Sequence, residues 1–140
     1  MTKEFATYEQ ALALKELGFD EPCIAFHNKL KFSNNISLCF LSQRVNNILN
    51  TVKNTNGTLI SAPLYQQAFR WFREKQYYSE INVGCTQIDG AVGFSWRIWK
   101  PWIIEEWSPE RPGEEWSYET YEESESACLD KLIAFVSNKQ

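Results

Sequence analysis

Residues 61–75, with the sequence SAPLYQQAFRWFREK, decide the fold class of this chain. Ser61 is a good capping residue and Pro63 suits the first turn of a helix, so we expect a helix to begin here. Its apolar side chains cover a wide arc opposite its charged ones, which is typical of a helix packed on a sheet. We expect four of them to face that sheet: Leu64, Ala68, Trp71 and Phe72.

Three strands are expected after this helix, at residues 77–85, 91–100 and 102–107. In the second of them, every other residue from Phe94 to Ile98 is apolar, the period-two pattern of a strand with one buried face. Asp89-Gly90 is a short turn of the kind that joins neighbouring strands as hairpins, and Pro101 is expected to end a strand. The sheet is therefore predicted to be mainly antiparallel.

Helices at the two ends are expected to complete the fold. Residues 7–10 and 120–123 have the T-x-x-Q and T-x-x-E forms of a capping box, which predict helices over 8–17 and from 121 to about 137. The last helix is expected to cover the same sheet with one apolar face, made of Tyr121, Cys128, Leu132, Phe135 and Val136. The chain is thus predicted to be one α+β domain, residues 1–140, with a mainly antiparallel sheet packed by two or three helices.

The stretch between the first helix and residue 61 gives weaker signals. Residues 22–26 have the composition of a short strand, and Asn28-Lys29 suits a turn. Residues 34–56 hold seven asparagines. Within them, apolar residues recur at helical spacing from Val45 to Val52, which predicts a short helix after Ser42.

The composition excludes a disordered chain and a spanning helix. The 140 residues are 44% hydrophobic, 15% aromatic and 23% charged, which is enough apolar material for an ordinary core. Uncharged apolar runs are only about half a dozen residues long, whereas a spanning helix needs about 20. Because no signal-like segment stands at the N-terminus, we expect a cytoplasmic protein that does not contact membranes.

The cysteines are expected to be reduced and free of metal. They are Cys23, Cys39, Cys85 and Cys128. No two of them have the C-x2-4-C spacing of a zinc knuckle, and the chain has a single histidine, so a zinc site would need long-range convergence. Their apolar neighbours favour small buried hydrophobic side chains in a reducing compartment. We therefore expect no metal and no cofactor.

His27 restricts the enzymatic mechanisms open to the chain. Any Ser–His or Cys–His chemistry must use it, and its expected place at a loop edge favours a solvated or hydrogen-bonded surface group. No nucleotide-binding or hydrolase motif occurs. The doublets Glu105-Glu106 and Glu114-Glu115 supply carboxylates, but adjacent residues of a strand point to opposite faces. The sequence thus favours a protein that is not an enzyme, with no catalytic residues.

Charge is distributed unevenly along the chain. Residues 22–104 carry nine basic and three acidic side chains, whereas residues 105–130 carry one arginine and ten acidic side chains. One interpretation is an acidic partner-binding face made of Glu119, Glu122, Glu123 and Asp130. The other is a solvated helix start, since acidic residues are favourable at the positive end of the helix dipole.

Five tryptophans lie between residues 96 and 116. They cannot all point to one face of a strand, so either both faces are buried or some of the rings are exposed as interface anchors. Together with the acidic segment, they favour a protein–protein interaction module with a protein partner of unknown identity.

Nucleic-acid binding is the alternative function. The order helix, three strands, helix over residues 63–137 resembles that of double-stranded RNA-binding domains. Those domains hold phosphates with basic residues near the start of the last helix, where this chain has glutamates, so we expect no binding to duplexes. A single-stranded nucleic acid could still contact one strand surface, through Arg97, Trp99 and Lys100.

Three phrases of the sequence, at residues 7–19, 62–75 and 120–133, resemble small proteins of unknown function encoded by phages and prophages of gut anaerobic bacteria. The resemblance covers about a third of the chain and includes no catalytic motif. It implies a small intracellular phage or mobile-element protein, whose partner would be a host or phage protein. It implies no activity.

Overall fold

The computed structural model describes residues 2–28, 36–38, 59–85, 90–102, 104–107 and 117–138. These residues form three α-helices and two three-stranded antiparallel sheets, which confirms the predicted α+β class. The strands lie in two sheets rather than in the one that we expected. The chain divides into two compact units, Met1–Ala68 and Phe69–Gln140, and the predicted single domain stays a prediction.

The first unit combines one helix with a small sheet of strand order β2-β1-β3. Its elements are the 3-10 helix η1 (Thr2–Glu4), α1 (Tyr8–Glu16), β1 (Ala25–Asn28), β2 (Ile36–Leu38) and β3 (Leu59–Ser61). Helix α1 begins where the capping box predicts: the hydroxyl of Thr7 accepts from the backbone N–H of Gln10 at 3.2 Å. It ends before Gly18, whose φ of +90° suits glycine. The predicted first helix is confirmed.

Two boundaries in this unit differ from those predicted. The strand lies at Ala25–Asn28 rather than at 22–26, so it passes through His27 and the residue expected to begin a turn. Ser61 does not cap a helix, because it pairs with Phe26 as the last residue of β3. Helix α3 (Tyr65–Glu74) begins four residues later. Hydrogen bonds between neighbouring strands therefore override the capping tendency of the serine.

Leu64, which we expected to face the large sheet, belongs to the first unit. It forms an isolated antiparallel bridge with Phe5 and packs against the small buried cluster of Phe5, Ala25 and Ala62. Trp71 and Phe72 are buried as predicted, and their rings meet edge to face with centroids 5.1 Å apart. The predicted helix after Ser42 lies outside the described residues.

The second unit contains the larger sheet, with strand order β4-β5-β6. The strands are β4 (Tyr78–Cys85), β5 (Val92–Lys100) and β6 (Ile104–Trp107), close to the three predicted ranges. Both pairings are antiparallel, and the register places Ile81 opposite Trp96. Strand β5 ends directly before Pro101, as its missing N–H requires. The predicted hairpin sheet is confirmed.

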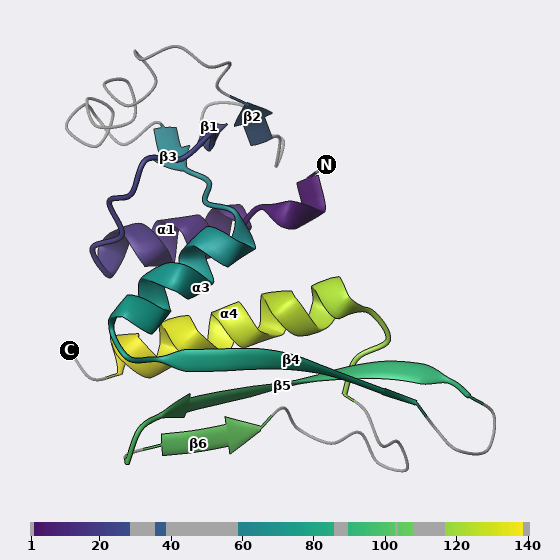
Figure 1. The fold of residues 1–140 in the computed structure, drawn as a ribbon. Helices are drawn as coiled ribbons and strands as arrows, with labels where there is room; N and C mark the ends of the chain where they lie inside the picture. The colour runs from purple at the N-terminus through teal and green to yellow at the C-terminus, as the bar shows by residue number, and fades with distance from the viewer. Residues whose placement is uncertain are drawn as a thin grey trace. The chain divides into compact units, whose positions relative to one another are not determined.

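Helix α4 (Tyr121–Ser137) lies along one face of this sheet and packs on β4 and β5 (Figure 1). Thr120 and Glu123 form the predicted capping box, with reciprocal hydrogen bonds of 3.2 and 3.3 Å. The buried stripe of α4 is Ser124, Cys128, Leu129, Leu132 and Ile133. Of the predicted apolar face, Cys128 and Leu132 are therefore confirmed as core residues, whereas the side chain of Tyr121 is about half exposed. In the described part of the chain, no helix is long and apolar enough to cross a bilayer.

Candidate functional site

The single histidine does not lie at the surface, so that prediction is wrong. His27 is buried within β1, and its Nε2 atom lies 2.9 Å from the carbonyl oxygen of Ala6. Its ring also meets the ring of Tyr8 edge to face. The burial arises because a strand and a segment 21 residues away meet at this point. His27 therefore has the surroundings of a structural residue that joins β1 to the N-terminal segment.

All four acidic residues proposed as a partner-binding face are exposed. Glu119, Glu122 and Glu123 lie together at the start of α4, and Asp130 lies two turns along the helix from Glu123. Glu123 also closes the capping box, so it has a structural role as well. The structure thus places three of the predicted residues in one cluster and the fourth about 10 Å further along the helix.

Glu125 is a fourth acidic residue near this helix start, and we did not include it in the partner-binding face predicted from the sequence. Burial, and then the charge of Glu122, raise its pKa. The two carboxylates are three residues apart on one helix face, which is the spacing that brings like charges together. That spacing was visible in the sequence. The partial burial of Glu125, which also raises its pKa, depends on the packing of α4 against the sheet.

The described tryptophans of β5 and the turn after it differ in exposure. Trp96 is buried, and its indole N–H donates a hydrogen bond of 3.2 Å to the hydroxyl of Tyr118. Trp102 is completely exposed and has a φ of +66°, a left-handed conformation that costs a non-glycine residue about 1 kcal/mol or more. The turn therefore holds one large apolar ring out in solvent. The side chains of Trp107 and Trp116 lie outside those that the structure describes.

The residues proposed for nucleic-acid contact lie on two faces of the sheet. The Arg97 guanidinium lies 5.0 Å from the centre of the Trp99 ring, and its Nη1 is 3.5 Å from Glu80 Oε1. Trp99 is also stacked on Tyr78, with centroids 5.7 Å apart. Lys100 lies on the other face, where its Nζ is 4.5 Å from the centre of the Tyr77 ring. The structure brings Arg97 and Trp99 together and separates Lys100 from them.

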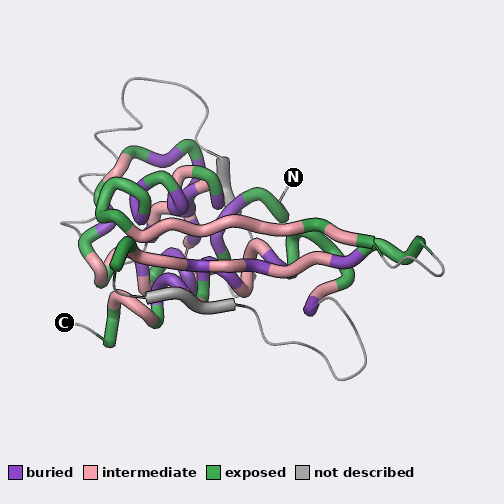
Figure 2. The backbone as a smooth tube through the Cα atoms, turned by 60° about the horizontal axis from the view of Figure 1, so that its bottom comes forward, coloured by how far each residue is buried: buried purple, intermediate pink, exposed green. Residues whose placement is uncertain are grey.

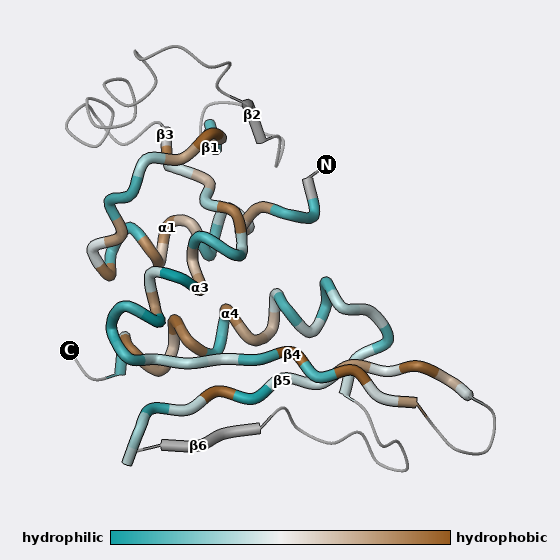
Figure 3. Tube along the Cα trace, viewed as in Figure 1, coloured by the Kyte–Doolittle hydropathy of each residue, from teal (hydrophilic) through white to brown (hydrophobic). Residues whose placement is uncertain are grey.

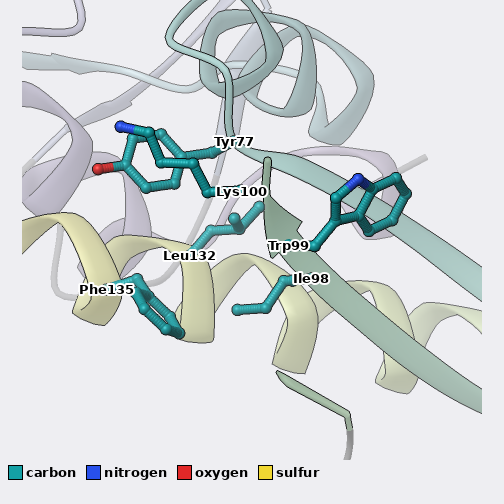
Figure 4. A pocket seen from close by; sticks show the side chains of 6 residues that line it. All are labelled: Tyr77, Ile98, Trp99, Lys100, Leu132 and Phe135. Carbon is teal, nitrogen blue, oxygen red and sulfur yellow. The ribbon is translucent and has the colours of Figure 1, made fainter. Parts of the chain in front are cut away.

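An apolar pocket lies between the end of β5 and the last turns of α4. Figure 4 shows Tyr77, Ile98, Lys100, Leu132 and Phe135 gathered around it, with the Trp99 ring turned away. Its open volume is about 180 Å³. Pockets that enclose small organic ligands usually have about 300–1,000 Å³. This pocket is therefore smaller than those that usually enclose a small organic ligand.

The far end of the β4–β5 hairpin carries exposed apolar side chains. Val83 and Val92 have exposed fractions of 67% and 57%. Tyr121, the first residue of α4, is 46% exposed and packs edge to face on Phe94 of β5. We call Val83, Cys85 and Val92 the open hairpin end. The sequence pattern predicted the strands, but not where the helix stops covering them.

The three described cysteines are free thiols. Cys23 and Cys128 are buried as predicted, whereas Cys85 is exposed at the open hairpin end, so the prediction of burial is wrong for Cys85. Burial raises the pKa of Cys128 to about 12. Across the described ranges, no three His, Cys, Asp or Glu residues lie close enough together to hold a metal ion. Cys39 lies outside those ranges.

No family model, curated protein or solved structure matches the chain. The candidate sites therefore stand on geometry and chemistry alone, and the resemblance to phage and prophage proteins stays a prediction.

Proposed function

We propose that the chain is a non-enzymatic protein–protein interaction module that binds its partner through residues 69–140. One observation carries the proposal: large apolar side chains stand exposed in this unit, and one of them, Tyr121, lies in the acidic start of α4. They are Trp102, Val83, Val92 and Tyr121. Exposed aromatic and aliphatic side chains of this kind are frequent anchors of protein interfaces.

The charge near these side chains indicates the charge that the partner's contact surface should carry. Glu119 and Glu122 flank Tyr121 in the sequence and are exposed. A basic surface would be attracted to this cluster, and complementary charge mainly increases the association rate and the specificity of binding. We therefore propose a basic partner surface. The resemblance to phage and prophage proteins supports an intracellular setting with a host or phage protein as that partner.

The surroundings of His27 support a role outside catalysis. One ring nitrogen is occupied by the Ala6 carbonyl group, and the ring is buried. A general base must reach the proton that it abstracts, and this imidazole has no open approach to a substrate. Chemistry that needs an accessible histidine is therefore disfavoured.

Binding of single-stranded nucleic acid remains the second candidate, because Arg97, Trp99 and Tyr78 form a cationic and aromatic strip on one sheet face. One feature weighs against it. Arg97 already has Glu80 as an ion-pair partner, and a carboxylate in this strip repels a phosphate backbone.

A retention experiment tests the proposal. The purified chain is immobilised and incubated with a lysate of a lysogenic bacterial host, and retained protein and nucleic acid are measured separately, with and without nuclease. We expect a retained protein that survives nuclease treatment. It should be lost when Glu119→Lys, Glu122→Lys and Asp130→Lys are combined, a variant that spares Glu123 because of its capping role.

The matched control combines Glu4→Lys, Glu16→Lys and Asp20→Lys, which reverse three exposed acidic residues of the first unit. This variant has the same net charge as the test variant and should retain the protein. Retention of nucleic acid alone, or equal loss with both triple variants, would contradict the proposed function.

A further inference from the structure

One face of the β4–β5 hairpin is apolar from Ile81 and Trp96 to the open hairpin end. Trp96 and Ile98 of β5 are buried beneath α4, and Phe94 meets Tyr121 on the same side. Because side chains alternate along a strand, Val92 also points to this face. The register pairs Val83 with Phe94 and Cys85 with Val92, so these two residues of β4 belong to it as well.

Helix α4 covers only part of this face. It begins at Tyr121, beside Phe94, and the hairpin continues beyond that point (Figure 1). Figure 2 shows that the strands of the hairpin are mainly intermediate in burial and become exposed at the hairpin end, and Figure 3 shows hydrophobic residues in this same part of β4 and β5. The apolar face thus runs on from the covered part of the sheet into solvent, where Val83 and Val92 are mostly exposed.

We propose that the open hairpin end, together with Tyr121, is the docking site for an amphipathic helix of a partner protein whose apolar stripe is flanked by lysine or arginine. The inference rests on the proposed function and names the surface and the chemistry of the partner.

The covered part of the sheet indicates what can cover the rest. Helix α4 already packs on this face through an apolar stripe, and a second helix placed beyond its start would continue the same layer. The apolar side chains that it would meet are the two valines and the Tyr121 ring. A helix whose stripe follows the i, i+3, i+4, i+7 pattern presents a complementary surface.

The acidic residues beside Tyr121 decide the charge of that helix. Glu119, Glu122 and Glu125 all lie within four residues of the ring. Basic side chains flanking the apolar stripe would lie near these carboxylates while the stripe covers the valines. A second copy of this chain fits less well, because two-fold pairing places the same acidic cluster on both partners. An anionic membrane surface would be repelled in the same way.

A designed peptide tests the surface directly. The probe is a 16-residue helical peptide with leucines at i, i+3, i+4 and i+7 and lysines at the positions that flank this stripe. It carries a fluorescent label so that binding can be measured by anisotropy. The comparison peptide has the same composition with the leucines scrambled. At about 150 mM salt, where charges are screened beyond about 8 Å, we expect the amphipathic peptide to bind at least about tenfold more tightly than the scrambled one.

Two variants of the chain assign the binding to a surface. Val83→Ser combined with Val92→Ser should weaken peptide binding at least about tenfold, since both apolar contacts are lost. Leu12→Ser combined with Ile24→Ser makes the same change at two exposed apolar residues of the first unit and should leave binding unchanged. Circular dichroism checks that both variants fold. Raising the salt to about 500 mM should weaken binding severalfold, because charge attraction contributes.

Several outcomes would overturn the inference. The first is equal binding of the amphipathic and the scrambled peptide. The second is equal peptide binding by the two double variants. The third is self-association of the chain that is lost with Val83→Ser and Val92→Ser. The last result would make a second copy the occupant. If the lysate protein is lost with the three charge reversals but kept by the valine variant, the docking site is wrong and the proposed function stands. If no lysate protein is retained at all, the proposed function is wrong, whether or not the peptide binds.

Discussion

The rings of Phe94 and Tyr121 meet edge to face, with centroids 6.1 Å apart and planes at 89°. This pair joins β5 to the first residue of α4 at the place where the covered part of the sheet meets the open hairpin end. The same neighbourhood carries the acidic cluster. The pair therefore fixes the start of α4 relative to the surface that we propose for partner binding.

Tyr121→Ala is expected to lower the free energy of unfolding by about 1 kcal/mol, since an edge-to-face pair contributes about 0.5–1.5 kcal/mol beyond its buried area. Tyr121→Phe keeps the ring and should change stability little. Urea denaturation measures both variants. Equal destabilisation by the two would show that the hydroxyl, and not the ring contact, stabilises the helix start.

Thr120→Ala should remove the capping hydrogen bond of α4 and cost about 1 kcal/mol of stability. Thr120→Ser retains the hydroxyl and should recover most of the loss. The same pair of substitutions at Thr7, which caps α1, provides an independent repeat in the first unit. Urea denaturation again provides the measurement. If alanine proves as stable as serine at both positions, the capping boxes do not contribute to stability.

Glu125→Gln is expected to make the protein more stable at neutral pH. Burial and the nearby charge of Glu122 raise the pKa of Glu125 above its ordinary value of 4.5, so the folded state holds this proton more tightly than the unfolded chain. The stability that the folded state gains from this tighter proton binding is present at low pH and is lost as the pH rises through the raised pKa of Glu125. Denaturation at pH 4 and pH 7 should thus show little difference between variant and wild type at pH 4 and a stabilised variant at pH 7. A variant that is less stable than wild type at pH 7 would contradict the assignment, and the exposed Glu16→Gln serves as control.

Cys85 and Cys128 should differ strongly in reactivity. In a Cys39→Ser background, a thiol reagent such as Ellman's reagent at pH 8 should modify the exposed Cys85 quickly. Cys128 should react only on unfolding, because it is buried and its pKa is raised to about 12. Adding Cys85→Ser should remove the fast phase. A fast phase that survives this substitution would show that one of the buried thiols is accessible.

The elements that form from local signals could be predicted from the sequence. Both capping boxes, the two helices that they begin, and the β4–β5 hairpin depend on residues that are close together in the chain. The prediction failed where distant segments compete with a local signal. Ser61 has the chemistry of a cap, but its pairing with Phe26, 35 positions earlier, makes it part of a strand.

The candidate site was only partly predictable for the same reason. The acidic residues at the start of α4 are exposed as the charge pattern suggests, because the buried stripe of the helix faces the other way. The burial of His27 and the exposure of Val83 and Val92 depend on which segment covers which surface. A strand pattern shows that a face is apolar, but it does not show how far a helix extends along that face.

Photo-crosslinking can show whether the chain binds a protein through its second unit. Benzoylphenylalanine is placed at position 121, and at the exposed position 24 of the first unit as control, and each protein is irradiated in a lysate of a lysogenic host. We expect a nuclease-resistant protein adduct from position 121 and none from position 24. An adduct from position 24 alone, or an adduct from position 121 that nuclease removes, would contradict this expectation.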